Sequence, residues 1–166
     1  MTYYYERVSS KRTQSLFLVL SLLFLGLLLG RVKIRRAKGA GRDRLANILA
    51  GASLFCLFYT LNYRTLIIWL TPETVQLRFG LFTWKIAMDN IDDCFPDQTS
   101  LWRIGGAGIH FSPIKRRYRA MFNFLEYPRV VVALKEKQGP VRDIAFSTQQ
   151  PEQVLAFIRG HTEETR

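Results

Sequence analysis

Apolar residues are concentrated in two uncharged runs near the start of the chain. The first run covers residues 13–30 and the second covers residues 45–63. Each is close to the roughly 20 residues that a helix needs to cross the hydrocarbon core of a bilayer. Leu and Phe occupy every face of the first run, so no polar stripe is left to face water. The pattern therefore predicts two transmembrane helices rather than one helix of a soluble core.

The segment between the runs, residues 31–44, is short and carries seven Lys or Arg against one Asp. A cleaved signal peptide is an alternative for the first run, because Arg7, Lys11 and Arg12 precede it. No small-residue cleavage site follows Gly30, where the basic segment begins instead. We therefore expect an antiparallel hairpin. Small residues of the second run should favour close helix packing. They are Ala46, Ala50, Gly51 and Ala52.

Aromatic residues flank the two runs at what would be the same side of the membrane. Tyr and Trp rings favour the headgroup region of a bilayer. Three tyrosines precede the first run and three aromatic residues surround the end of the second: Tyr3, Tyr4, Tyr5, Tyr59, Tyr63 and Trp69. The arrangement predicts two crossings with both termini on one face.

After the second run the apolar pattern changes to a period of two, which is typical of half-buried strands. Residues 65–70, TLIIWL, predict a short strand that ends before Pro72. Residues 75–79 and 82–88 alternate with opposite parity around Gly80, which predicts a β-hairpin. The following acidic stretch, residues 89–97, is predicted to be turn-like.

The rest of the chain predicts further short strands and one helix. Gly105 to Gly108 form a flexible turn before a strand rather than a phosphate-binding loop, because no Lys-Ser/Thr follows. Apolar alternation predicts strands over residues 118–124 and 130–134, and another after the turn at Gly139. Pro151 marks the start of an amphipathic C-terminal helix. About seven short strands with one helix predict a small barrel or sandwich.

The net charge and the cysteine content limit the kinds of partner and bound group that this chain is expected to have. The 166-residue chain has a net charge of +11, which favours anionic partners such as lipid headgroups or nucleic acid. Its two cysteines, Cys56 and Cys94, lie in different regions and form neither a disulfide framework nor a metal-ligand spacing. We therefore expect no metal and no cofactor. An unpaired Cys94 weakly favours a reducing compartment.

Residues 70–91 resemble the opening signature of bacterial pleckstrin-homology-like domains, which follow a pair of membrane helices. Its elements are an L-T-x-E turn, an R-x-G strand end and an x-x-I turn, at Leu70, Thr71, Glu73, Arg78, Gly80, Asp89 and Ile91. Ala87 departs from the family, which often has Pro there. The resemblance covers about residues 64–160. It implies an α+β membrane protein whose antiparallel PH-like β-barrel is capped by a C-terminal helix, without catalytic residues.

These features divide the chain into six expected segments. They are an N-terminal flank at 1–12, a transmembrane helix at 13–30, a basic loop at 31–44, a transmembrane helix at 45–63, a PH-like domain at 64–160 and a polar tail at 161–166.

Two other classes of function were weighed. A small membrane-associated enzyme would need a nucleophile, a base and an orienting group. His110 and His161 have no evident partners, and Asp89, Asp92, Asp93 and Asp97 lack the spacing of a calcium loop. A nucleic-acid module would need exposed aromatic residues for stacking, whereas Tyr118 and Phe122 alternate as core residues do. We expect neither an enzyme nor nucleic-acid binding.

The preferred function is a membrane-anchored, non-catalytic module that docks anionic lipid headgroups or a membrane protein partner at the bilayer surface. The candidate contact is a basic cluster at a loop-to-strand junction: Lys115, Arg116, Arg117 and Arg119. A solvated charged loop is the alternative for this cluster. Edge-strand pairing or helix contact in the bilayer could also assemble copies of the chain.

The expected location is the cell membrane, with two crossings, but two arguments disagree about the side of the domain. The positive-inside rule places residues 31–44 in the cytoplasm and the domain outside. The family resemblance places the domain in the cytoplasm, and we prefer that side.

Overall fold

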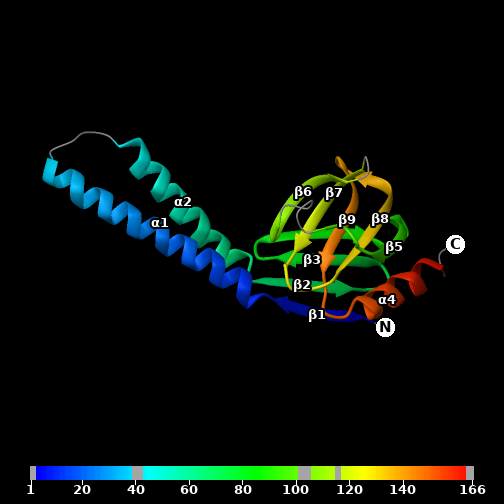
Figure 1. Cartoon of the computed structure of the whole chain (residues 1–166). Coiled ribbons are helices and arrows are strands. Elements are labelled where there is room, and N and C mark those ends of the chain that lie inside the picture. The colour runs from blue at the N-terminus through cyan, green and yellow to red at the C-terminus, as the bar shows by residue number, and fades with distance from the viewer. Residues whose placement is uncertain (1–2, 39–42, 101–105, 115–116, 164–166) are drawn as a thin grey trace. The chain divides into compact units, whose positions relative to one another are not determined.

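The computed structural model describes residues 3–38, 43–100, 106–114 and 117–163, without the side chains of residues 35–38 and 163. Figure 1 shows a pair of long helices and a part built of two sheets and a terminal helix. These are separate compact units: residues Lys11–Arg64 form the helical unit, and Met1–Ser10 with Thr65–Arg166 form the two-sheet unit. The helical unit is thus an insertion within the sequence of the other.

The helical unit consists of α1 (Lys11–Lys38) and α2 (Arg44–Asn62). Helix α1 continues eight residues beyond Gly30, so the prediction of a loop from residue 31 was wrong there. The sequence RVKIRRAK contains no Gly or Pro to end a helix. Helix α2 begins after Asp43, whose carboxylate accepts from the Leu45 N–H at 3.0 Å and from Arg31 Nε at 2.7 Å. This N-cap satisfies one of the unpaired amides of the first turn.

The two helices are joined by a reciprocal pair of serines. Ser21 Oγ donates to the Ser53 carbonyl at 3.0 Å, and Ser53 Oγ donates to the Ser21 carbonyl at 3.0 Å. Such polar contacts hold helices together where the surroundings are apolar. A Cβ on Gly51 would meet no atom within 4 Å, so this glycine does not mark the close approach that we expected of it.

Most large apolar side chains of the helical unit are exposed. Val19 on α1 is 61% exposed and Leu54 on α2 is 67% exposed. By length and composition, both helices are able to cross a membrane. Exposed apolar side chains thus occur along both helices.

The first sheet has four antiparallel strands in the order β1 (Tyr4–Ser9), β2 (Thr65–Leu70), β3 (Thr74–Phe79) and β4 (Phe82–Ala87). The expected strands at 65–70, 75–79 and 82–88 are therefore present, and Gly80 turns between the last two with a φ of 60°. Alternation along the strands buries one face of the sheet. Its buried apolar residues are Val8, Leu66, Ile68, Leu70, Val75, Leu77, Phe79 and Ile86.

Part of the expected N-terminal flank at residues 1–12 forms strand β1. Its buried Glu6 accepts hydrogen bonds from Thr148 Oγ1, from the Gln149 N–H at 2.7 Å and from Tyr4 Oη at 2.8 Å. Burial and this carboxylate raise the pKa of the Tyr4 phenol above its usual value. These contacts tie the start of the chain to the segment before the C-terminal helix, so β1 belongs to the fold.

The second sheet has five strands in the order β5-β8-β9-β7-β6. They are β5 (Ile91–Pro96), β6 (Gly108–Ile114), β7 (Arg117–Asn123), β8 (Arg129–Gln138) and β9 (Val141–Ser147). Strands β7 and β9 are parallel, whereas the other neighbours are antiparallel. The sequence had predicted antiparallel pairing only.

The sequence had predicted a turn throughout the acidic stretch after β4, and this prediction was wrong for most of it. A short 3-10 helix, η1 (Met88–Asn90), redirects the chain, and Ile91 then starts β5. Asn90 fixes this corner, because its side chain donates to the Glu136 carbonyl at 3.0 Å and accepts from the Glu136 N–H at 2.8 Å. Strand β5 consequently pairs with β8 and not with β4.

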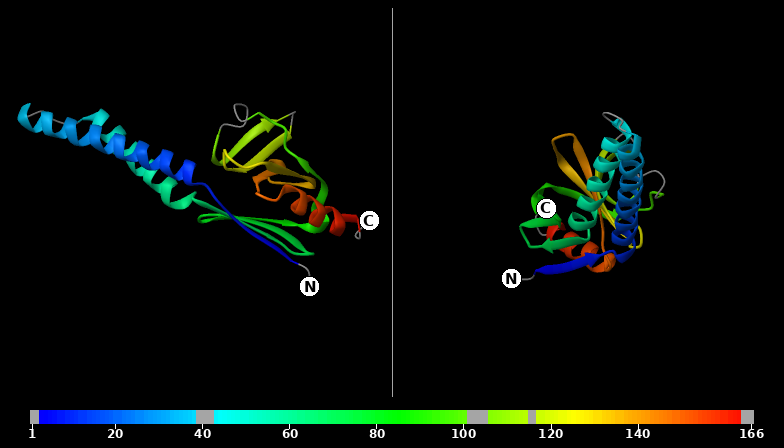
Figure 2. Two further views of the ribbon diagram at one scale, coloured as in Figure 1. Left: turned by 60° about the horizontal axis from the view of Figure 1, so that its bottom comes forward. Right: turned by 90° about the vertical axis from the view of Figure 1, so that its left-hand side faces the viewer.

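The core lies between the two sheets, with helix α4 (Pro151–Glu163) packed on β5, β8 and η1. The views in Figure 2 show the two sheets facing one another and α4 beside them. Phe79 meets Phe124 edge-on with ring centroids 5.0 Å apart, and Trp84 meets Phe122 at 6.1 Å. Because β4 and β5 do not pair, the described strands form two sheets and not the closed barrel that we expected.

Candidate functional site

The predicted basic cluster is divided by the structure. Lys115 and Arg116 lie outside the described residues. Arg117 and Arg119 are on β7, where the Arg117 side chain is 47% exposed and the Arg119 side chain only 6%. Arg119 is thus a buried residue of the second sheet, and we remove it from the proposed surface contact.

Strand register places a carboxylate opposite Arg119. Strands β7 and β9 are parallel, and Arg119 pairs directly with Asp143. Arg119 Nη2 donates to Asp143 Oδ2 at 3.2 Å, and Arg117 Nη1 donates to Asp143 Oδ1 at 3.2 Å. Each oxygen of the buried Asp143 carboxylate therefore accepts a hydrogen bond from a different arginine.

Asp97, which follows β5, is the second carboxylate of this network. It accepts from Arg119 Nη1 at 3.1 Å, from Arg129 Nε at 2.9 Å and from the Thr99 N–H at 3.0 Å. Burial by itself would raise the pKa of Asp97, but the bonds from Thr99 and Arg129 outweigh it and lower that pKa below its usual value. Asp97 is therefore ionised at neutral pH.

The network joins three strands of the second sheet to the segment after β5. Three arginines face two aspartates, so one positive charge is left over. Arg129 also donates to the Thr99 carbonyl. Removing one partner from a buried ion pair is costly, because the remaining charge stays buried without compensation. The network therefore has a structural role, fixing the segment after β5 against β7, β8 and β9.

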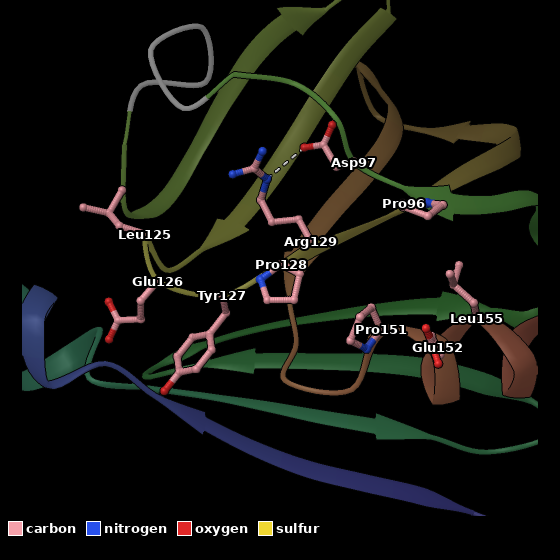
Figure 3. A pocket seen from close by; sticks show the side chains of 10 residues that line it. All are labelled: Pro96, Asp97, Leu125, Glu126, Tyr127, Pro128, Arg129, Pro151, Glu152 and Leu155. Atoms are coloured by element: carbon pink, nitrogen blue, oxygen red, sulfur yellow. Dashed lines mark hydrogen bonds and ion pairs between the residues drawn. The ribbon is translucent and has the colours of Figure 1, made fainter.

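A cavity of about 480 Å³ lies beside this network (Figure 3). Asp97 and Arg129 form one wall, where Figure 3 shows the ion pair between them. The other lining residues come from the end of β5, the β7–β8 turn and the start of α4: Pro96, Leu125, Glu126, Tyr127, Pro128, Pro151, Glu152 and Leu155.

The β7–β8 turn that lines the cavity also holds the end of β1. Tyr127 Oη donates to the Ser9 carbonyl at 2.8 Å, and Ser10 Oγ donates to Glu126 Oε2 at 2.8 Å. Asp97 and Glu126 are thus engaged in hydrogen bonds, and the ten lining residues include no His, Cys, Lys, Ser or Thr. The cavity supplies no nucleophile with an adjacent base.

The remaining candidates from the sequence are dispersed. His110 lies on β6, and His161 Nδ1 is 2.8 Å from the Phe157 carbonyl oxygen on α4. Burial raises the pKa of the Cys94 thiol to about 12, which disfavours the reactive thiolate. Among the described residues, no three His, Cys, Asp or Glu side chains are grouped to hold a metal ion.

The glycine-rich turn is described only from Gly106 onward. Gly106 and Gly108 have φ values of 102° and 100°, which favour glycine. Asn123 donates to the Gly106 carbonyl at 3.0 Å, and this fixes the start of β6.

The sequence analysis missed Asp143 and Arg129 as members of the ion-pair network. One signal was present, because Asp143 has the same strand parity as Val141 and Ala145, which are fully buried. A carboxylate on an inward-facing position requires a cationic or hydrogen-bonding partner. Which cation would supply it depended on the parallel pairing of β7 and β9.

Comparison with known proteins gives no relative: no protein family, curated protein or solved structure matches this chain.

Proposed function

We propose that this chain is a membrane-anchored, non-catalytic docking module. Helices α1 and α2 cross the bilayer, and the two-sheet unit is a PH-like domain that binds the anionic headgroup region at its surface. The two facing sheets and the C-terminal helix support the PH-like assignment. A membrane protein partner is the alternative occupant, and the test below separates the two.

The observation that carries this proposal is the place of the hairpin in the sheet. Ser9 and Thr65 are cross-strand partners at one end of β1 and β2, and the helical unit is inserted between them. The two-sheet unit is therefore tethered at two neighbouring points, without a long linker on either side. A domain attached in this way stays within a few residues of the membrane that its anchor spans.

The surface of the anchor supports the same proposal. Soluble proteins rarely expose large contiguous apolar patches, because burying that surface is strongly favourable. Here exposed apolar side chains occur along both helices, including Val19 and Leu54. Two polar residues within the helices, Ser21 and Ser53, donate hydrogen bonds to each other's carbonyl groups, as the interior of a bilayer requires.

Membrane extraction tests the anchor. Alkaline carbonate should leave the full chain in the membrane pellet. The matched control replaces residues 11–63 by Asn-Gly, so that a short turn followed by Arg64 connects Ser10 to β2. This variant keeps β1 and should be released into the supernatant. Release of the full chain would refute the anchor.

Vesicle binding tests the docking function. The hairpin-replaced variant should sediment with vesicles containing phosphatidylserine at low salt, and less so at high salt, because exposed charges are screened. It should not sediment with phosphatidylcholine vesicles. Failure to bind either lipid would favour a protein partner, which crosslinking in native membranes would then capture.

We place the two-sheet unit on the cytoplasmic face. Cys56 and Cys94 are both buried, so a cysteine added after residue 166 would be the accessible thiol. An impermeant maleimide should label it only after the cells are opened. Labelling in intact cells would place the unit outside, as the positive charge of residues 31–44 suggests.

A further inference from the structure

We propose that the outer face of the β1–β4 sheet is the surface that contacts anionic phospholipid headgroups. This face is defined by the outward residues of the four strands. They are Tyr5, Arg7, Ile67, Trp69, Gln76, Arg78, Thr83 and Lys85. The inference rests on the proposed function and assigns that function to a surface other than the basic cluster.

Register assembles the outer face in two rows across the sheet. Tyr5 pairs with Trp69, which pairs with Gln76, and Gln76 pairs with Lys85. The second row joins Arg7, Ile67, Arg78 and Thr83 in the same way. Residues far apart in the sequence thus form one continuous surface, opposite the buried face of the same strands.

The outer face combines exposed aromatic rings with cations. Tyr5 is 56% exposed and Trp69 is 47% exposed, although both are large amphipathic residues. Arg7, Arg78 and Lys85 are exposed on the same face, and its strand positions hold no Asp or Glu. A shallow groove of about 210 Å³ lies between the aromatic rings and Arg78. It is lined by Tyr5, Ile67, Trp69, Gln76 and Arg78.

This chemistry fits the headgroup region of a bilayer. Trp and Tyr rings prefer that region, where one part of the ring meets apolar chains and the other meets water. Lys and Arg beside them are attracted to anionic lipid within a Debye length, about 8 Å at physiological ionic strength. A face that combines aromatic rings with cations, and has no carboxylate at its strand positions, therefore complements an anionic lipid surface.

The outer face is also close to the anchor along the strands. Arg7 and Ile67 lie two residues from the Ser9–Thr65 pair at which the chain enters and leaves the helical unit. At a rise of about 3.3 Å per residue, this is roughly 7 Å, and Trp69 is roughly 13 Å from the same pair. These residues of the outer face therefore lie only a few positions along the chain from the start and end of the helical unit.

A second copy of the chain is a poorer occupant than lipid. Two such faces in a symmetric dimer would bring two sets of the same three cations together, with no carboxylate on either face to compensate. Charge complementarity therefore favours an anionic lipid surface.

Quenching of Trp69 by brominated lipid tests the proposal in the full chain. The protein is placed in nanodiscs of phosphatidylcholine brominated near the glycerol, with or without phosphatidylserine. The quenching lost in a Trp69→Phe variant is assigned to Trp69. We expect a Trp69 contribution in anionic discs, at least a twofold decrease of that contribution in zwitterionic discs, and a similar decrease in an Arg7→Gln/Arg78→Gln variant.

The matched control is Lys137→Gln/Arg142→Gln, which removes two exposed cations from the second sheet and should leave Trp69 quenching unchanged. Equal quenching of the wild type and Trp69→Phe, or quenching independent of lipid charge, would overturn the inference. A disulfide between copies carrying Gln76→Cys, without quenching of Trp69, would also overturn it in favour of a dimer. Carbonate extraction of membranes that contain the full chain separates the two proposals, because a protein that is retained in those membranes but is unquenched in nanodiscs refutes only the lipid-facing surface.

Discussion

Arginines occur in two contrasting settings on strands of the two-sheet unit. Arg119 and Arg129 are buried in the second sheet and bonded to Asp97 and Asp143. Arg7 and Arg78 are exposed on the first sheet, beside aromatic residues and away from carboxylates. In the sequence the buried Arg119 and the exposed Arg78 both stand between two apolar or aromatic residues. The difference shows that register and burial, rather than local pattern, decide whether an arginine stabilises the fold or is available to a partner.

The largest expected effect on stability comes from removing a carboxylate from the buried ion-pair network. Asp143→Ala would leave the buried Arg119 sharing Asp97 with Arg129, so that positive charge in the network would be uncompensated, which costs about 3–5 kcal/mol in the free energy of unfolding. Urea unfolding of the detergent-solubilised full chain measures it. All three tryptophans follow residue 64, so their fluorescence reports the two-sheet unit alone. Exposed Arg142→Ala is the control, and a cost below about 1 kcal/mol for Asp143→Ala would contradict the network.

The loss of folding stability at acid pH tests the same buried ion-pair network. The pKa of Asp97 is lower in the folded chain than its usual value of about 3.9. Its stabilising contribution is therefore complete above that value and is lost as the pH falls through the folded pKa. Asp97→Asn should cost about 2 kcal/mol at pH 7 and flatten the loss of stability below pH ~4. If Asp97→Asn leaves the loss of stability at acid pH unchanged, that loss is caused by other titrating groups.

Substitutions of two neighbouring residues on β1, Glu6 and Arg7, test the buried and the exposed face of one strand. Glu6→Gln weakens the acceptor for Thr148, Gln149 and Tyr4 and should cost about 2 kcal/mol, as buried hydrogen bonds to a charged group do. Arg7→Gln on the opposite face should change stability by less than about 0.5 kcal/mol. The same urea titration measures both. Equal costs would mean that β1 is not placed with Glu6 inward.

The smallest stability effect is expected for the exposed arginines together. Arg7→Gln/Arg78→Gln should leave the free energy of unfolding within about 0.5 kcal/mol of the wild type while weakening contact with anionic lipid. Binding lost at unchanged stability would distinguish a contact surface from a structural one. A destabilisation of several kcal/mol would remove the contrast between the two settings.

Much of the fold followed from local pattern. The two helices appear where long uncharged runs leave no polar face, and β2, β3 and β4 appear where residues alternate on either side of Gly80. The departures arose where local pattern was not decisive. Residues 31–38 are basic but contain no helix breaker, so α1 continues through them. The stretch before Cys94 is acidic, yet pairing with β8 makes it a strand.

The candidate site was less accessible from the sequence. The basic cluster was visible as a charge run, but a run does not show which side chains turn inward. Arg119 does so because β7 lies between β6 and β9, with Asp143 directly opposite. Tyr5 and Trp69 were predicted to be interfacial from their residue type, and this stays a prediction, whereas their pairing on one sheet face required the β1–β2 register.

The sequence by itself determined the two apolar helices and the alternation of most strands, because hydrophobic period is a property of neighbouring residues. Only the tertiary structure decided that β1, separated by the whole hairpin, completes the first sheet. It also decided that Arg119 is neutralised and that Arg7, Trp69 and Arg78 share one face. These outcomes depend on strand pairing between distant segments, and the free energy that selects one register comes from burial and ion pairing across the assembled sheets.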